Sequence, residues 1–452
     1  MTAISRIALP ALLLAAAACS RAGGDAQAKE APPATSAAPS APAASAEAPS
    51  TAAEASKPPA CDPGNGGIAL PAGFCATVFA DGLASPRHVA VAANGDVYVA
   101  LDGGRTGGGG VMALRDTNGD GKADVKQRFG ADKGTGIALS GRDLYFAPDD
   151  RVLRYTLAPG TLVPAGAPAT VVSGLPTGGH TAKTIAMDGR GGLFVNVGSG
   201  TNVCQQRDRQ GQSPGMDPCP ELSSRAGIWR FDAGRAGQRQ DAAGRFATGI
   251  RNAVAITVAP DGRLFALQHG RDQLGDWPAH FSPQDNAEKP GEELIQVNRG
   301  DDFGWPYCFY DPIAKRKVLG PEYGGDGRQM GRCTARKDPL MAFPGHWAPE
   351  SIVFYTGGQF PARYRGGAFV AFHGSWNRAP LPQAGYRVVF VPFAGGRPGG
   401  RYEDFATGFA GAQPNPGSAH RPMGLAAAPD GSLYVTDDSG GRVWRIVYRG
   451  AR

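Results

Sequence analysis

The segment DTNGDGKAD at residues 116–124 places carboxylate and amide side chains at alternating positions. Such hard oxygen ligands suit calcium, and a glycine at the sharp turn is typical of calcium loops. The last ligand of an EF-hand is absent, because Gln127 stands in its place. The spacing predicts a half-loop that binds structural calcium; a metal-free Asn/Asp/Gly turn is the alternative. The predicted ligands are Asp116, Asn118, Asp120 and Asp124.

A histidine, His180, stands in the glycine-rich stretch GGHTAKTI that begins at Gly178. Imidazole titrates near neutral pH, so its neutral form accepts a proton under working conditions. The loop precedes an apolar run, where a substrate could approach. The position predicts a general base, and an ordinary surface histidine is the alternative.

One phrase recurs along the chain and predicts the elements that hold these residues. It consists of an alternating apolar run, a turn with glycine, and a second β-like run. Alternation at period two indicates strands, and Asn-Gly or Asp-Gly indicates a tight turn. The copies begin at Val89, Ile137, Thr184, Ala255 and Leu425, and a stretched copy begins at Ser351.

Six such hairpins, each followed by further β-like sequence, predict six four-stranded units. Units of this kind around an axis form an all-β six-bladed propeller of antiparallel blades. Residues 61–452 provide about 65 residues per blade, and a bare blade needs roughly 40–50. The excess is expected in insertions at about 200–225 and 268–350, which often carry function. A β-sandwich or two β domains are the alternative.

The N-terminus is expected to be a targeting segment. Arg6 precedes an apolar run too short to span a bilayer. The run ends in small residues before Cys19, which resembles a bacterial lipoprotein signal. We therefore expect a signal peptide at 1–18, lipidation of Cys19 and a disordered Ala/Pro/Ser-rich tether at 19–60. Cleavage of an ordinary signal peptide after an alanine is the alternative.

The remaining cysteines are even in number, which favours disulfides in an exported protein. They fall into three close pairs, and this clustering favours Cys61–Cys75, Cys204–Cys219 and Cys308–Cys333. Ser20 in place of aspartate favours the outer membrane over the inner one. The sequence thus predicts a periplasmic protein of the bacterial cell envelope, with the membrane reached through a lipid anchor only.

The charge distribution argues against a nucleic-acid partner. The formal net charge is +6 over 452 residues. The arginines are scattered, without the basic stripe and interleaved aromatics that nucleic-acid binding requires.

Five stretches together resemble the glucose/sorbosone dehydrogenase family, the soluble pyrroloquinoline quinone (PQQ) sugar dehydrogenases. They are the His180 region, ATGIRN at 247–252, GDDFGWPY at 300–307, and the FVAFHGSWNR and RPMGL stretches that begin at Phe369 and Arg421. The last two fit the sorbosone dehydrogenase-like branch. The resemblance extends from about residue 66 onward.

The resemblance implies roles for individual residues. His180 corresponds to the catalytic base. Arg251 and Asn252 correspond to an Arg-Asn pair that faces the quinone, and Arg421 to an arginine that pairs with a cofactor carboxylate. Arginine binds carboxylate in a fork and stabilises charge on a reduced quinone.

The resemblance also implies a calcium ion that binds the cofactor through two consecutive backbone carbonyls. These correspond to Gly270 and Arg271, although the family has a proline at the second position. Glu292 or Glu293 corresponds to an acidic residue near the cofactor, with a solvated pair as the alternative. The family's lysine near the quinone has no counterpart. His373, Trp376 and Arg378 stand in that stretch, and His373 or Arg378 is expected to contact the cofactor.

The sequence therefore predicts an oxidoreductase that oxidises a sugar hemiacetal or aldehyde with PQQ and Ca2+. Its partners would be a small sugar and a periplasmic electron acceptor. Side chains cannot accept hydride, so a cofactor must. The alternatives are a non-catalytic envelope propeller that binds glycan or protein, and a lactonase-type metal-dependent hydrolase. A hydrolase would need several carboxylates and an asparagine around one ion, and no such set is evident.

Overall fold

The computed structural model describes residues 60–104, 107–415 and 417–450. The signal peptide, Cys19 and nearly all of the predicted tether lie outside these residues. Within the described part of the chain, no helix is long and apolar enough to cross a membrane.

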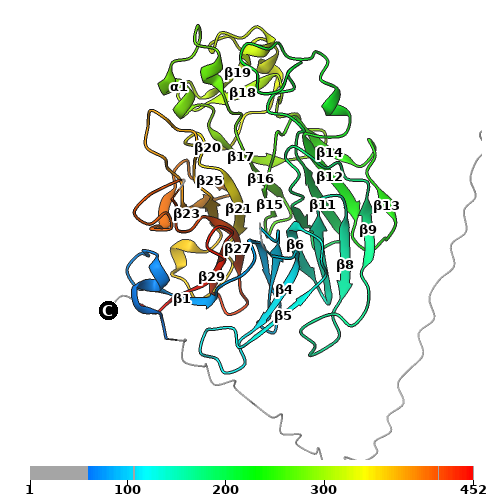
Figure 1. Cartoon of the computed structure of the whole chain (residues 1–452), viewed down its shortest axis with the longest axis vertical. Coiled ribbons are helices and arrows are strands. Elements are labelled where there is room, and N and C mark those ends of the chain that lie inside the picture. Colours follow the sequence, from blue (N-terminus) through cyan, green and yellow to red (C-terminus); the bar gives the residue numbers. More distant parts are fainter. Residues whose placement is uncertain (1–59, 105–106, 416, 451–452) are drawn as a thin grey trace, which may run out of the picture. The chain divides into compact units, whose positions relative to one another are not determined.

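Six antiparallel sheets form the domain, as the repeats predict (Figure 1). The first three blades comprise β2 (Pro86–Val91), β3 (Val97–Leu101), β4 (Gly110–Arg115) and β5 (Val125–Phe129); β6 (Gly134–Ser140), β7 (Asp143–Pro148), β8 (Val152–Thr156) and β9 (Ala169–Ser173); and β10 (Ile185–Met187), β11 (Gly192–Val197), β12 (Gly227–Asp232) and β14 (Arg245–Thr248). The next two comprise β15 (Ala255–Val258), β16 (Leu264–Gln268), β17 (Glu292–Val297) and β20 (Met341–Phe343); and β21 (Pro349–Phe354), β22 (Ala368–Phe372), β23 (Arg387–Val391) and β26 (Glu403–Ala406). The sixth joins β27 (Pro422–Ala427), β28 (Leu433–Asp437) and β29 (Arg442–Tyr448) to β1 (Phe74–Ala80).

Short elements complete the domain. A fifth strand, β13 (Gln238–Arg239), pairs in parallel with β9. Two small hairpins are β18 (Cys308–Asp311) with β19 (Arg316–Leu319), and β24 (Phe393–Ala394) with β25 (Arg397–Pro398). The one α-helix among the described residues is α1 (Pro283–Glu288). Short 3-10 segments lie at Pro63–Gly67, Pro220–Ser223, Leu274–Asp276, Pro321–Tyr323, Gly331–Ala335 and Ala362–Tyr364.

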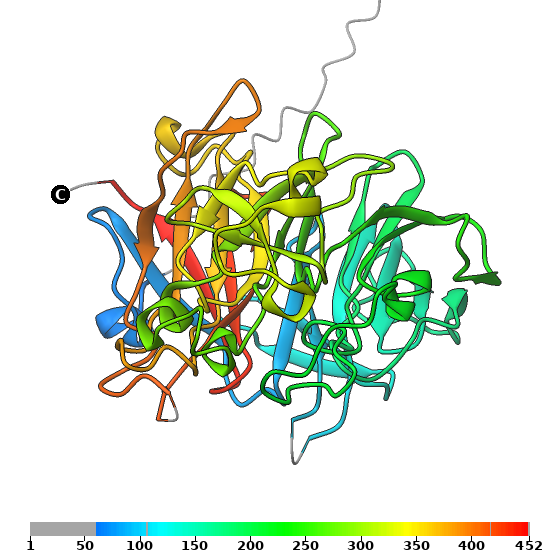
Figure 2. The ribbon, with the colours of Figure 1, turned by 90° about the horizontal axis from the view of Figure 1, so that it is seen from above.

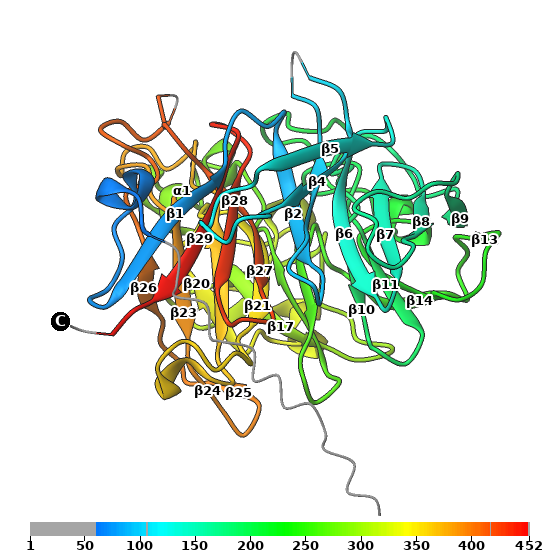
Figure 3. The same ribbon diagram turned by 90° about the horizontal axis from the view of Figure 1, so that it is seen from below.

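The first strand of each blade faces the axis of the propeller. β2, β6, β10, β15, β21 and β27 contact one another in sequence, and β27 closes the ring onto β2. Figure 3 shows several of these strands side by side around the middle of the domain. They enclose an axial cavity of about 350 Å3, lined mainly by apolar side chains. Gly95, with φ of +91°, occupies the tight turn between β2 and β3, as the Asn-Gly signal predicts.

Hydrophobic clusters join neighbouring blades. Phe74 of the sixth blade packs edge-on against Phe405 of the fifth, with ring centroids 5.0 Å apart. Edge-to-face contacts of this kind add stability beyond the area that they bury. The outer strand β1 pairs with β29, so that residues from the two ends of the domain complete one sheet.

Long connections cover one face of the ring, and we call them the insertion cap. They are residues 198–226 after β11, 269–291 after β16, 298–340 after β17 and 373–386 after β22. Figure 1 shows α1, β18 and β19 of the cap above β17 and β20, and Figure 2 shows the domain from above. Side chains interlock the connections: the Trp305 indole donates to the Asn202 carbonyl at 2.9 Å.

The three predicted disulfides are confirmed. They join Cys61 to Cys75, Cys204 to Cys219 and Cys308 to Cys333. The second and third lie in the insertion cap, where they cross-link connections that contain little regular structure. A cross-link restricts the unfolded chain and so stabilises such segments.

Candidate functional site

A cavity of about 220 Å3 is lined mainly by residues of the insertion cap and of the connections that precede β10, β15 and β21. It brings together His180, Arg251 and Gly270, which come from three different connections. The lining residues are His180, Arg209, Arg251, His269, Gly270, Asp272, Glu292, His346, Ala348, Trp376 and Asn377. Basic and hydrogen-bonding groups dominate this wall, which therefore suits a polar or anionic ligand.

His180 is held with one ring nitrogen fixed. Its Nδ1 lies 3.0 Å from the Ser199 carbonyl oxygen and 2.9 Å from the Ser199 hydroxyl oxygen. That hydroxyl donates to the Thr201 carbonyl at 2.6 Å, so it can only accept from the ring. Nδ1 therefore carries the proton, and Nε2 has the free lone pair of a base.

Burial and the nearby Arg251 charge lower the pKa of His180 well below its ordinary value. The ring is therefore neutral at physiological pH. Its backbone passes very close to β11: a Cβ on Gly198 would lie only 2.6 Å from the His180 Cβ. Glycine at position 198 is what permits this approach.

The Arg251 guanidinium is buried in the cavity wall, with 4% of the residue exposed. It donates to Gly270 O at 2.8 Å, to Asn202 Oδ1 at 3.0 Å and to Asp272 Oδ2 at 3.0 Å. Burial lowers its pKa, while Asp272 opposes this effect. Asn252 lies behind the wall, where its amide oxygen accepts from Asn196 at 3.1 Å.

Asp272 is a residue that sequence reasoning missed. Its carboxylate accepts from Arg251 and Arg209, both at 3.0 Å, and from Asn377 at 2.9 Å. His346 lies 3.8 Å away. Burial works to raise the Asp272 pKa, but the surrounding cations, Arg251 first, lower it to about 2. Asp272 thus joins three connections of the cap around one negative charge.

A second polar group contains Arg421 and His373, and neither residue lines this cavity. The Arg421 guanidinium donates to the His373 and Gly374 carbonyls, at 3.0 and 2.6 Å. His373 Nε2 lies 2.7 Å from the Asp438 carboxylate, which also pairs with Arg87 at 2.5 Å. Although burial works to raise it, His373 and Arg87 hold the Asp438 pKa well below its usual range. Arg87 and Asp438 were not anticipated from the sequence.

Glu350 lies near both groups, since its charge acts on Arg87 of the second group. One of its carboxylate oxygens lies 3.8 Å from His269, which lines the cavity. The other oxygen is buried and has no hydrogen-bond partner among the described residues. A buried unsatisfied carboxylate oxygen is costly unless a ligand, ion or water meets it.

Arg378 does not reach the cavity. It is buried, and it donates to the Gly345 carbonyl at 2.6 Å. Its desolvation lowers its pKa. The arrangement makes Arg378 an anchor between two connections. Trp376, two residues earlier, lines the cavity and is 59% exposed.

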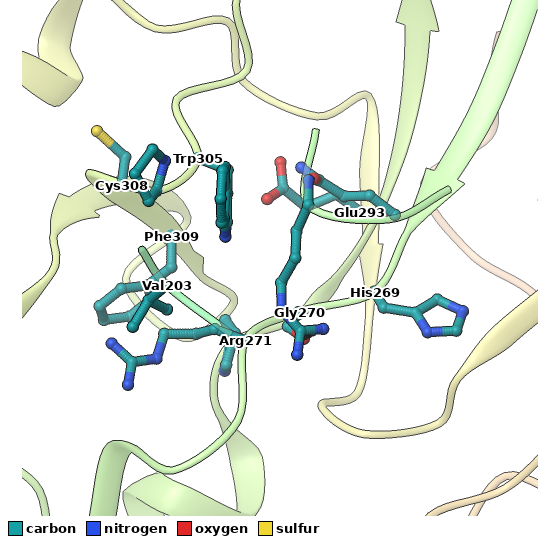
Figure 4. A pocket seen from close by; sticks show the side chains of 12 residues that line it. Val203, His269, Gly270, Arg271, Glu293, Trp305, Cys308 and Phe309 are labelled. Atoms are coloured by element: carbon teal, nitrogen blue, oxygen red, sulfur yellow. Dashed lines mark hydrogen bonds between the residues drawn. The ribbon is translucent and has the colours of Figure 1, made fainter. Parts of the chain in front are cut away.

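The predicted carbonyl pair for calcium lies beside the cavity. The Gly270 carbonyl accepts from Arg251, and the Arg271 side chain pairs with buried Glu322 at 2.5 Å. Figure 4 shows the Arg271 side chain and the His269 ring pointing in opposite directions from the Gly270 backbone. Glu292 lines the cavity and accepts from Gly270 N at 2.8 Å.

Glu293 has a different role, because it forms a buried ion pair with Lys317 at 2.6 Å.

The carboxylates of the 116–124 loop accept hydrogen bonds from the loop's own backbone: Asp116 accepts from Gly119 N and Gly121 N, and Asp124 accepts from Thr117 N. Within the described ranges, no group of three or more His, Cys, Asp or Glu side chains could hold a metal ion.

Known proteins match almost the whole domain. The TrAA12-like family model matches residues 68–449. The PQQ-dependent pyranose dehydrogenase of Coprinopsis cinerea is 26% identical over 421 residues, covering 83% of this chain and 54% of that protein. The chain therefore spans about half the length of the curated relatives that it matches.

Solved structures share the fold. The holo PQQ domain of the Coprinopsis cinerea pyranose dehydrogenase superposes with a TM-score of 0.68 at 23% identity, covering 84% of this chain and 97% of that one. A calcium structure of a Trichoderma reesei family AA12 protein gives 0.69 at 22% identity, with the same coverage. The predicted resemblance to PQQ-dependent sugar dehydrogenase propellers is confirmed. The chain belongs to the TrAA12-like family.

Proposed function

We propose that the protein is a PQQ-dependent oxidoreductase that oxidises a pyranose or related sugar at its hemiacetal carbon. The observation that carries this proposal is the neutral His180, whose Nε2 is free as a base in a cavity walled by arginine. The similarity to a PQQ-dependent pyranose dehydrogenase supports the same activity.

The residues present fit the cofactor. PQQ carries three carboxylates and an ortho-quinone, so it needs several cations and donors. Arg251 and Arg209 line the cavity, while Arg421 and Arg87 belong to the second polar group around His373 and Asp438. Guanidinium groups bind carboxylates in a fork and do not lose their charge. When bound, the quinone supplies the hydride acceptor that side chains lack.

The protein's own contribution to the reaction is proton transfer and positioning. His180 Nε2 takes the proton of the sugar hydroxyl, and Ser199 keeps the ring in the required tautomer. Arg251 holds positive charge where negative charge develops, and Asp272 fixes its position. Such preorganised groups stabilise a transition state without reorganising during the reaction.

Calcium is part of the same proposal. The Gly270 and Arg271 carbonyls would hold the ion once an anionic ligand draws Arg251 away from Gly270 O. The remaining ligands would come from water and the cofactor, since Ca2+ takes roughly six to eight oxygens. The calcium structure of a similar family AA12 protein supports calcium as the metal. The 116–124 loop remains a separate candidate for structural calcium.

The envelope location is likewise proposed from the sequence. Lipid on Cys19 would hold the domain at the outer membrane through the 19–60 tether, with reduced cofactor reoxidised by a periplasmic electron acceptor. The motif before Cys19 supports this location.

Reconstitution tests the proposal. Apoprotein is mixed with PQQ, Ca2+, both or neither, and reduction of a redox dye is followed with a panel of aldoses. We expect activity only with both additions, together with a shifted PQQ absorbance. No turnover of any sugar and no PQQ binding would refute the function and favour a non-catalytic binding propeller.

A further inference from the structure

Trp376 is much more exposed to solvent than the other tryptophans of this protein. Trp229, Trp305, Trp347 and Trp444 are each at most 6% exposed and Trp277 is half-buried, whereas Trp376 is 59% exposed. Large exposed apolar side chains that line a concave site commonly mark binding surfaces.

The backbone on both sides of Trp376 is anchored. Ser375 is fully buried, and its hydroxyl lies 2.6 Å from the Gln383 amide oxygen. The Asn377 amide donates to Asp272 at 2.9 Å, and Arg378 donates to Gly345 O at 2.6 Å. The indole therefore belongs to a segment whose residues on both sides, one before it and two after it, are held by hydrogen bonds.

The surroundings of the indole combine one flat apolar surface with several polar groups. Asp272, Asn377 and Arg209 line the same cavity, as does His180. A pyranose ring has an apolar C–H face and a rim of hydroxyls. Aromatic faces accept such C–H groups, while carboxylate, amide and guanidinium groups bind hydroxyls.

We propose that Trp376 is the platform on which the substrate's pyranose ring stacks, and that it makes the site selective for cyclic sugars over open-chain polyols and aldehydes. This inference rests on the proposed function for its kinetic test, but sugar binding tests it independently. A competing arrangement, in which the indole stacks on the cofactor ring, is an outcome of the same experiment.

The test compares wild type, Trp376→Ala, Trp376→Phe and Ile313→Ala. Ile313, on the turn between β18 and β19, is the other strongly exposed large apolar residue of the described chain, at 63%, and it is absent from the cavity lining. It therefore controls for loss of exposed apolar surface. Three quantities are measured: KM and kcat for D-glucose, PQQ affinity by absorbance, and binding of D-glucose and D-sorbitol by saturation-transfer NMR.

We expect Trp376→Ala to weaken D-glucose binding and raise KM about fivefold to tenfold, the range of an aromatic contact. Sorbitol binding, PQQ affinity and kcat should change less than threefold. Trp376→Phe should restore most of the loss, and Ile313→Ala should match wild type. A weaker PQQ affinity with unchanged sugar binding would overturn the proposal, as would equal effects on glucose and sorbitol, or no glucose binding by wild type.

Failure of the proposed function is recognised separately. A protein that binds D-glucose through Trp376 but neither binds PQQ nor reduces dye would retain the sugar platform and lose the dehydrogenase assignment.

Discussion

The Asp272 carboxylate lies 3.0 Å from the guanidinium of Arg251, deep in the wall of the cavity. The same carboxylate holds Arg209 at 3.0 Å near the surface. One carboxylate therefore pairs with a buried arginine and an exposed one, so the contributions of the two ion pairs to stability can be compared directly.

Asp272→Asn should lower the free energy of unfolding by about 3 kcal/mol, because it leaves Arg251 buried without an anionic partner. Arg209→Ala should cost less than about 1 kcal/mol, since the Arg209 side chain is 41% exposed. Urea unfolding of both variants measures the difference. Equal losses would show that Asp272 does not compensate the buried charge.

His180→Ala should reduce kcat by roughly 10²–10⁴ while PQQ affinity stays within about twofold, because a general base acts on the sugar hydroxyl. Arg251→Ala should reduce both PQQ affinity and rate. The melting temperature of each variant provides the control. Turnover by His180→Ala within a few-fold of wild type would remove the catalytic assignment.

Acid should destabilise the protein through His88. Burial lowers the His88 pKa from 6.5 to about 4, so the unfolded chain takes up this proton first. Stability is then fully present above pH 6.5 and falls by about 3 kcal/mol as the pH drops to about 4. Carboxylates with a lowered pKa, such as Asp272 at about 2, lose their stabilising contribution only below that pH range.

The control for this prediction is His88→Gln, which retains a donor for the Glu350 carbonyl that His88 Nε2 contacts at 2.8 Å. Its stability should vary less between pH 6.5 and 4. An unchanged slope in urea titrations across that range would assign the acid sensitivity to other groups.

Removing calcium with EGTA should weaken PQQ binding, and Ca2+ should restore it better than Mg2+, which demands a smaller octahedral site. Asp120→Asn separates the two candidate sites. It should leave the calcium dependence of PQQ binding intact and reduce only the Ca2+-induced rise in melting temperature. PQQ binding that is indifferent to EGTA would exclude the Gly270–Arg271 site.

Cys19→Ala should release the protein from membranes, since lipid on this thiol is the sole anchor proposed. Fractionation of cells after a salt wash measures the effect. A variant that stays with the membrane fraction would contradict lipidation as the means of attachment.

The fold could be predicted because each blade repeats the same hairpin pattern within a short stretch of sequence. Alternation and an Asn-Gly or Asp-Gly turn occur within a dozen residues, so β2–β3 and β27–β28 can be recognised without tertiary contacts. The three disulfides follow for the same reason, since each joins cysteines of one local segment.

The site could be predicted only where a local motif marks it. His180 and Arg251 stand in recognisable stretches, and both line the cavity. Asp272 and Asp438 gain their partners from other blades, which no local pattern specifies. Arg87 carried no such signal: Pro86 and Pro422 begin the corresponding inner strands, so in register Arg87 aligns with Met423 and not with Arg421.

Phe74 of β1 lies opposite Tyr448 of β29, so the sixth blade is assembled from both ends of the domain. The ring cannot close until the last strand has left the ribosome. Pairing partners so distant in sequence make the final step of folding slow, because the entropy of a very long loop must be lost first. A chain truncated before Arg442 would keep β1 as an unpaired edge and would be prone to aggregate.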